Sequence, residues 1–230
     1  MVPTGTWMTT DPYEQCGLLG NPFVAEPAQP WTEPGWADRT PAEPPAPGQG
    51  LLIQFIGVKG AGKSTTLNRF RSRSPGPHRY VPPGPGRWRP LPVAPLVYWD
   101  ELDRSPAGLR WAGWRRAARI RATVVAGTHV DLAAEATRAG LRVQTIELPL
   151  ISVAELTTWA EARLAGARRS PAGAGATWLL PPADAARIAA EVGASWRRAA
   201  DLMHIWVADE VARRTRALEA GRGEEGPYRR

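Results

Sequence analysis

The chain has 230 residues, of which 43% are apolar, enough for one substantial core in a compact domain with flanking segments. Its formal net charge of +7 would suit a polyanionic partner such as nucleic acid, with a solvated basic surface as the alternative. No apolar stretch reaches the roughly 20 residues of a membrane helix, and the N-terminus lacks a signal-peptide pattern, so we expect a cytoplasmic protein. A single cysteine, Cys16, excludes an internal disulfide, and the three histidines lack metal-ligand spacing.

Residues 1–49 are rich in Pro, Gly and Trp without a sustained period, which predicts an irregular N-terminal extension. From residue 51 onward, short apolar runs alternate with helical patterns. Strands are expected at 51–57, 78–81, 96–100, 122–128 and 141–148, and helices at 64–72, 105–120 and 131–140. Such alternation indicates βαβ units, and therefore a three-layer α/β core with a mostly parallel sheet.

The interval from 72 to 95 is rich in Pro and Gly, so the strand at 78–81 is expected to be short within a connection that is mostly loop. After residue 151 the chain shows helical patterns alone, at 153–166, 182–193 and 195–220. The predicted organisation is an α/β core over 50–150, a small helical lid over 151–218 and a frayed tail over 219–230.

The segment GVKGAGKS, residues 57–64, fits the phosphate-binding pattern G-x-x-x-x-G-K-[ST] without a mismatch. Glycines let the backbone wrap around phosphate oxygens, Lys63 reaches the outer phosphates, and Ser64 places its hydroxyl on Mg²⁺. The chain has only two lysines, and the other one, Lys59, occupies a variable position of the motif and is expected to be solvated. The residues expected to bind nucleotide are Gly57, Gly60, Ala61, Gly62, Lys63, Ser64 and Thr65.

The segment LVYWDELDR, residues 96–104, is an apolar run that ends in the adjacent acids Asp100 and Glu101. Downstream of a phosphate loop it resembles the Walker B element of P-loop ATPases. In that role Asp100 would hold Mg²⁺ together with Ser64, and Glu101 would act as general base on the attacking water. The kinase and GTPase division usually lacks the second acid, whereas the additional-strand catalytic-glutamate group, with the AAA+ and STAND ATPases, carries it. The chain resembles this second group.

The resemblance implies further site residues. After the Walker B strand, AAA+ and STAND ATPases present a polar residue called sensor 1, for which Thr128 is the first choice and His129 the second. An arginine of the lid, called sensor 2, faces the γ-phosphate; Arg197 matches best, with Arg198 adjacent. The NPF motif at 21–23 is similar to a short motif that helps seat the adenine.

Two features depart from this family. The proline-rich connection between the phosphate loop and the acid pair leaves little room for a second strand and helix. No clear arginine finger precedes the last strand, where Arg138 is the candidate, so a ring that depends on such a finger is in doubt.

The helix expected at 105–120 interleaves arginines with Trp111 and Trp114. This pattern could grip a nucleic-acid backbone and stack on bases. The favoured interpretation is that both tryptophans anchor the helix on the sheet and the arginines are solvated.

The resemblance implies an ATP-binding protein that hydrolyses ATP with Mg²⁺ and couples hydrolysis to a conformational change. One alternative is a small-molecule or nucleotide kinase, although the Arg-rich mobile lid expected within a kinase core is missing. Another is a non-hydrolysing nucleotide switch that docks a partner or DNA. Besides ATP, a protein partner or a second copy of the chain is expected.

Overall fold

The computed structural model describes residues 11–24, 29–37, 43–169 and 177–224. The chain divides into two compact units. We call residues 28–151 and 192–197 the sheet unit, and residues 1–27, 152–191 and 198–230 the helical unit.

The sheet unit is built on five parallel strands in the order β2-β3-β4-β1-β5. They are β1 (Leu51–Ile56), β2 (His78–Tyr80), β3 (Leu96–Asp100), β4 (Thr123–Thr128) and β5 (Arg142–Glu147). Strands β3 and β4 are buried along their whole length, as continuous apolar runs predict for a sheet that is covered on both faces. Strand β4 lies between β1 and β3, so the strand that precedes the phosphate loop does not pair with the strand that carries the acids.

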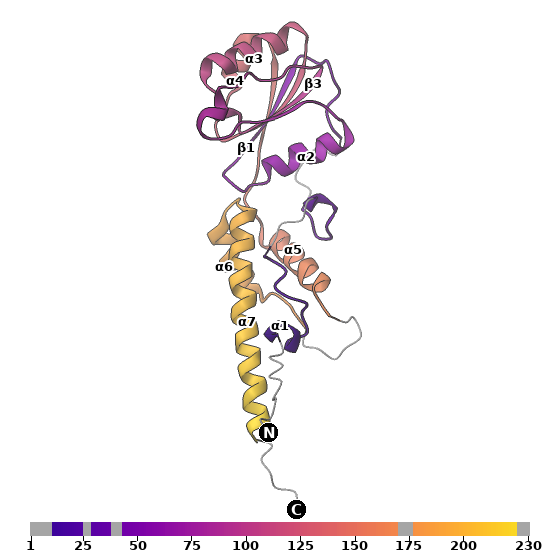
Figure 1. Ribbon diagram of the computed structural model, residues 1–230, viewed down its shortest axis with the longest axis vertical. Coiled ribbons are helices and arrows are strands. Elements are labelled where there is room, and N and C mark those ends of the chain that lie inside the picture. The colour runs from indigo at the N-terminus through magenta and orange to yellow at the C-terminus, as the bar shows by residue number, and fades with distance from the viewer. Residues whose placement is uncertain (1–10, 25–28, 38–42, 170–176, 225–230) are drawn as a thin grey trace, which may run out of the picture. The chain divides into compact units, whose positions relative to one another are not determined.

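Helices cover both faces of this sheet, which confirms the expected three-layer α/β core followed by a helical region (Figure 1). On one face lies α2 (Lys63–Arg73), whose Phe70 ring packs 6.0 Å from that of Phe55 in β1. On the other face lie α3 (Ala107–Arg119) and α4 (Ala133–Ala139). The anchor of α3 is Trp114, which is fully buried with its ring 5.0 Å from that of Trp99 in β3.

The connection from α2 to β3 contains β2, which is only three residues long. This agrees with the short strand that the sequence predicted. The segment between β2 and β3 forms no α-helix; its proline-rich chain forms the 3-10 helix η2 (Gly84–Trp88) instead. A further 3-10 helix, η3 (Leu102–Arg104), follows the acid pair directly, and η1 (Pro30–Thr32) lies in the N-terminal part of the unit.

The helical unit contains α1 (Pro12–Gln15), α5 (Val153–Gly166), α6 (Pro182–Val192) and most of α7 (Trp196–Glu224), the long helix of Figure 1. A capping box of Ser152 and Glu155 fixes the start of α5. Residues 11–24 pack within this unit: the amide of Leu19 donates to Ala167 O at 2.8 Å, and Trp178 Nε1 donates to Cys16 O at 3.1 Å.

The N-terminal extension expected over 1–49 is therefore not one irregular piece. Residues 11–24 belong to the helical unit, whereas Ala46 accepts a hydrogen bond from the Thr123 hydroxyl of β4 at 2.7 Å. Helix α7 continues to Glu224, past residue 218, although its last turns include Gly221 and Gly223. Across the described residues, no helix combines the length and apolarity that a membrane crossing requires.

Candidate functional site

In a parallel sheet the carboxyl ends of the strands meet at one edge, and this geometry assembles the site. The phosphate-loop motif follows β1, Asp100 ends β3, and Thr128 ends β4; Glu101 and His129 come directly after these two strands. Because β4 lies between β1 and β3, its last residues separate the loop from the acids.

The loop between β1 and α2 depends on its glycines. Gly60 and Gly62 have φ of 86° and 101°, a left-handed region that side-chain-bearing residues rarely adopt, and Gly62 is the N-cap of α2. A Cβ at Gly57 would come within 3.1 Å of Ala61 Cβ, so the loop also closes tightly on itself. The first backbone amides of α2 have no hydrogen-bond acceptor within the helix. They are therefore available to an anion bound by the loop.

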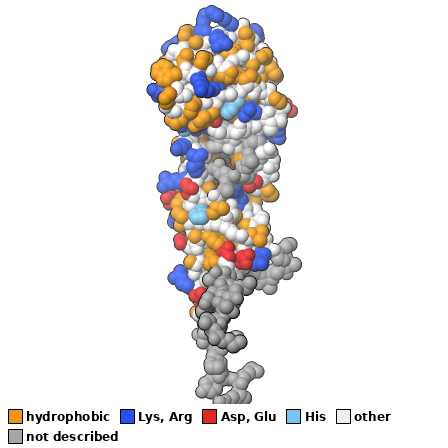
Figure 2. Space-filling model, viewed as in Figure 1, with side chains coloured by type: hydrophobic (Ala, Val, Ile, Leu, Met, Phe, Trp, Pro, Cys, Tyr) orange, Lys and Arg blue, Asp and Glu red, His pale blue; other side chains and the backbone are white. Residues whose placement is uncertain are grey.

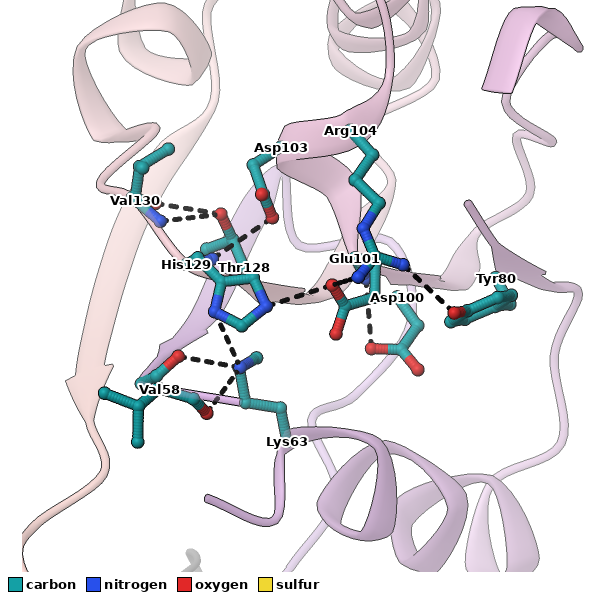
Figure 3. Close-up of polar contacts among 11 residues, drawn as sticks. Val58, Lys63, Tyr80, Asp100, Glu101, Asp103, Arg104, Thr128, His129 and Val130 are labelled. Atoms are coloured by element: carbon teal, nitrogen blue, oxygen red, sulfur yellow. Dashed lines mark hydrogen bonds and ion pairs between the residues drawn. The ribbon is translucent and has the colours of Figure 1, made fainter. Parts of the chain in front are cut away.

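Lys63 lies beneath this loop with only 4% of its surface exposed. Its Nζ donates to Gly57 O at 2.7 Å and Val58 O at 3.0 Å, and lies 3.3 Å from Nδ1 of His129 (Figure 3). Burial lowers the pKa of the ammonium, while the carboxylates of Glu101 and Asp100 act in the opposite direction. The loop therefore holds a buried cation whose acceptors are mostly neutral carbonyls.

Asp100, at the end of β3, is also buried. Burial raises the pKa of its carboxyl; hydrogen bonding by Ser64 opposes that rise, and the neighbouring Glu101 charge adds to it. A Cβ at Gly127 of β4 would lie 2.7 Å from Asp100 Oδ1 and 3.4 Å from Lys63 Cβ. Glycine at this position is what lets the carboxylate and the start of α2 approach each other.

Glu101 has a left-handed backbone, with φ of 55° and ψ of 42°, which costs about 1–2 kcal/mol for a residue with a side chain. Such strain tends to persist at functional sites, where the surrounding structure enforces it. Its Oε2 accepts from Arg104 Nη2 at 2.9 Å and from His129 Nε2 at 3.0 Å. Arg104 in turn donates to the Tyr80 hydroxyl at 3.0 Å. The carboxylate is thus fixed by two donors, as Figure 3 shows.

The His129 ring lies between Lys63 and Glu101, and the tautomer with a proton on Nε2 satisfies both contacts. Its backbone amide donates to Asp103 Oδ1 at 3.1 Å, which holds the end of β4 against η3. The Thr128 hydroxyl is turned away into a tight loop: it donates to Val130 O at 2.9 Å and lies 3.2 Å from the Val130 amide. The structure therefore places His129, the second choice from sequence, beside the acids, and Thr128 in the turn.

The start of α7 contacts the phosphate loop within the sheet unit. Ser195 Oγ donates to Lys59 O at 3.0 Å, and the Trp196 amide donates to Gly60 O at 3.0 Å. A Cβ at Gly60 would meet Ser195 Oγ at 2.5 Å and Arg197 Cβ at 3.0 Å. Arg197 is exposed beside the loop, in the first turn of α7.

Other residues singled out from the sequence lie elsewhere. Arg198 pairs with Glu191 at 3.0 Å, and Arg138 is exposed on α4. In the helical unit, Asn21 Nδ2 donates to His204 O at 2.9 Å, and the Phe23 ring packs 5.1 Å from that of Trp159. The described contacts of the NPF motif are therefore with helices α1, α5 and α7.

The site offers oxygen ligands suited to Mg²⁺. Within the part of the chain that the structure describes, no three His, Cys, Asp or Glu side chains gather closely enough to hold a metal. The hydrogen-bonded Ser64 and Asp100 provide two oxygens, and Mg²⁺ at phosphate sites commonly takes one or two protein oxygens besides phosphate and water. The donor set therefore fits Mg²⁺ that arrives with a phosphate ligand.

Sequence reasoning missed two contributors to the site, Arg104 and Gly127. The spacing of three residues between Glu101 and Arg104 is one at which opposite charges meet on a helical turn, and could have indicated their pairing. Gly127 gives no such signal, because its requirement arises from the approach of β3 and α2, which are remote in sequence.

The chain matches no protein-family model, and none of the curated proteins matches it. Among solved structures it is similar to a single-residue variant of RuvB from Thermotoga maritima, with 16% identity and a TM-score of 0.41, over 66% of this chain and 52% of that chain. It is also similar to the Thermotoga maritima RuvB Holliday junction branch migration motor, with 15% identity, a TM-score of 0.41 and the same coverage. The chain spans about half the length of the RuvB structures that it matches.

Proposed function

We propose that this chain binds ATP together with Mg²⁺ and hydrolyses the ATP. The observation that carries this proposal is the convergence of a buried lysine, a buried aspartate and an oriented glutamate at one edge of the sheet. Lys63 and Glu101 contact opposite nitrogens of the same imidazole, that of His129. A phosphate loop and a carboxylate are thereby held within reach of one small site.

Each residue has a distinct role in this proposal. The loop glycines and the amides at the start of α2 bind phosphate oxygens, and the Lys63 ammonium exchanges neutral carbonyl acceptors for charged phosphate oxygens. Ser64 and Asp100 hold Mg²⁺, which neutralises phosphate charge when bound. Glu101 accepts a proton from the attacking water as general base.

The fixed position of Glu101 favours hydrolysis over a non-hydrolysing switch, because a switch needs no base. A kinase would use such a base on a bound hydroxyl, and the Arg-rich mobile lid expected within a kinase core is missing from the sequence. Here the backbone of Glu101 is strained, and two donors, Arg104 and His129, orient the Glu101 carboxylate. The position of β4 between β1 and β3 supports the same assignment, because it is the additional strand that gives the catalytic-glutamate group its name.

His129 takes the role of sensor 1 in this proposal, since its ring contacts the general base whereas the Thr128 hydroxyl closes a turn. For Arg197 the proposed role stays that of sensor 2, which is supported by its place beside Gly60. The bonds from Ser195 and Trp196 to the loop carbonyls would carry a change in the loop to the start of α7. Arg138 as an arginine finger, and a protein partner or a second copy of the chain, stay predictions.

Substitution of Glu101 by Gln tests the proposal most directly. Gln keeps the shape of the side chain and removes the base, so we expect hydrolysis to fall by at least about 100-fold with ATP binding retained. Single-turnover assays with γ-labelled ATP measure both phosphate release and label transferred to other molecules. Unchanged phosphate release by the Glu101→Gln variant would overturn the assignment of the base, and label recovered on an acceptor other than water would identify a kinase.

A further inference from the structure

The sheet unit has a large excess of basic side chains over acidic ones. Between residues 44 and 151 the chain has sixteen Lys and Arg but only six Asp and Glu. There is no acidic residue from 44 to 99, nor from 104 to 130. Three of the six acids lie at or beside the site, and Asp131 and Glu135 are hydrogen-bonded to Gln54 and Arg110. From 44 to 151, basic residues therefore outnumber acidic ones by ten.

Helix α3 concentrates this charge on its outer face. Its inner face is the one that contains Gly113, Trp114 and Ala117, all buried against the sheet. On the outer face Trp111 is 43% exposed, and the Arg115 guanidinium carbon lies 5.9 Å from the centre of its ring. The expectation that both tryptophans of this helix are core anchors is thus correct for Trp114 and wrong for Trp111, because the helical period turns Trp111 to solvent.

A second exposed tryptophan is presented by η2. Trp88 is 60% exposed, with the Arg87 guanidinium carbon 5.7 Å from the centre of its ring. This segment is held in place, since Arg79 Nη2 donates to Gly86 O at 2.7 Å and Leu91 is buried in the core. A Cβ at Gly113 would lie 2.9 Å from Leu91 Cδ1, so the segment that follows η2 packs directly on α3.

The two elements belong to the same side of the sheet, because Leu91, Trp114 and Ala117 share one hydrophobic core cluster. We define the Arg/Trp surface as Arg87, Trp88, Trp111, Arg115, Arg116 and Arg119, all of which are exposed. Figure 2 shows Lys and Arg side chains intermingled with hydrophobic ones on the surface of the sheet unit. In each of the two Arg–Trp pairs a cation lies over a flat aromatic ring.

We propose that the Arg/Trp surface binds single-stranded nucleic acid. Its guanidinium groups neutralise phosphates along the strand, and the indole rings of Trp88 and Trp111 stack on unpaired bases. The backbone that carries each indole already forms a regular element, η2 or α3, so binding does not have to order it.

Single strands suit this surface better than other polyanions do. A duplex hides the faces of its bases, so exposed indoles would gain little from it. An anionic membrane calls for a broad apolar face, whereas the apolar face of α3 is already buried against the sheet and its outer face has one large apolar side chain in Trp111.

Binding of the strand is independent of the proposed hydrolysis, because none of the six residues belongs to the phosphate-loop and acid-pair site. The titrations are therefore made without nucleotide, and failure of one proposal leaves the other standing.

The test is fluorescence anisotropy of a dye-labelled thymidine oligonucleotide titrated with the full chain at several KCl concentrations. We expect saturable binding that weakens as salt rises. Trp88→Ala and Trp111→Ala should each weaken binding roughly 5- to 100-fold, the range for loss of one stacked base, while Trp111→Phe should retain most of it. Arg115→Gln should also reduce the dependence on salt. The matched control Arg187→Gln removes one exposed positive charge from α6 in the helical unit and should leave binding unchanged.

Three results would overturn the proposal. In the first, the two Trp→Ala variants bind the oligonucleotide as tightly as the unaltered chain does. In the second, the chain binds the matching duplex more tightly than the single strand. In the third, the chain binds phosphatidylserine vesicles but not the oligonucleotide. Thermal unfolding of each variant shows that its fold is intact; because Trp88 and Trp111 are 60% and 43% exposed, we expect smaller shifts of the midpoint than for substitution of a buried tryptophan.

Discussion

Nε2 of His129 lies 3.0 Å from Oε2 of Glu101, and Nδ1 of the same ring lies 3.3 Å from Nζ of Lys63. One imidazole thus contacts both the proposed general base and the lysine proposed to bind phosphate. His129 is a positioning residue in this arrangement, because it acts on the reaction through the orientation of Glu101.

Removal of this imidazole should impair turnover more than binding. We expect His129→Ala to lower kcat for ATP hydrolysis by about 10- to 100-fold with little change in KM, because Glu101 loses one of its two orienting donors. His129→Gln can place an amide N–H near the position of Nε2 and should recover part of kcat. Steady-state kinetics of both variants checks this, and a loss that appears in KM alone would contradict it.

The two lysines of the chain form a matched pair. Lys63→Ala should weaken ATP binding by roughly 10- to 100-fold, as expected for loss of a charge-assisted hydrogen bond to phosphate. Lys59→Ala removes the same charge from an exposed, variable position of the loop, between Gly57 and Gly60, and should leave affinity nearly unchanged. Calorimetric titration with ATP and Mg²⁺ distinguishes the two; equal losses would show that only the net charge of the loop matters.

The buried carboxyl of Asp100 should make folding stability depend on pH in a definite direction. Burial raises its pKa in the folded protein above the unfolded value, so its contribution is fully present below the unfolded pKa and is lost as pH rises through the folded pKa. Asp100→Asn removes this loss and should raise the free energy of unfolding at neutral pH.

Thermal unfolding of the unaltered chain and of Asp100→Asn, followed from about pH 3 to pH 8, provides the measurement. The two curves should converge at the acid end and separate as pH rises, with the variant the more stable. Hydrolysis by the variant should be lost in the same preparations, because Asp100 is a proposed Mg²⁺ ligand. A variant that is less stable at neutral pH would contradict the direction of the pKa shift.

Two glycines of the phosphate loop separate backbone strain from packing. Gly60→Ala and Gly62→Ala both place a side chain at positive φ, but only at Gly60 would the Cβ meet Ser195 and Arg197. We expect Gly62→Ala to cost about 1 kcal/mol of unfolding free energy and Gly60→Ala about 1–3 kcal/mol more. Chemical denaturation measures the unfolding free energy of both variants. Equal costs would show that Ser195 and Arg197 move aside for the added side chain.

The tryptophans of α3 should differ sharply in their effect on stability. Trp114 is fully buried against Trp99, so Trp114→Ala should cost about 3–5 kcal/mol. Trp111→Ala should cost clearly less than Trp114→Ala, because 43% of the Trp111 surface is exposed whereas Trp114 is fully buried. Urea unfolding of the two variants tests this, and similar losses would mean that Trp111 is buried in solution.

Most of the sheet unit could be predicted from the sequence, since its strands are continuous apolar runs and its helices repeat with a period near 3.6. The short β2 was expected, whereas the division of residues 1–49 between the two units was not. That division depends on contacts such as those of Ala46 with Thr123 and of Leu19 with Ala167, which join segments remote in sequence. Periodicity reports burial along one segment and carries no information about which distant segment covers it.

The sequence by itself determined the two motifs of the candidate site: a glycine loop with Lys63 at its phosphate-binding position, and an apolar strand that ends in two acids. The tertiary structure alone decided which residues around these motifs contact each other. It placed His129 rather than Thr128 beside Glu101, made Gly127 necessary, brought Arg197 beside Gly60 and turned Trp111 outward. The physical reason is that local motifs fix backbone conformation and residue type, whereas the direction of a side chain and its partner depend on strand order and on packing between distant elements.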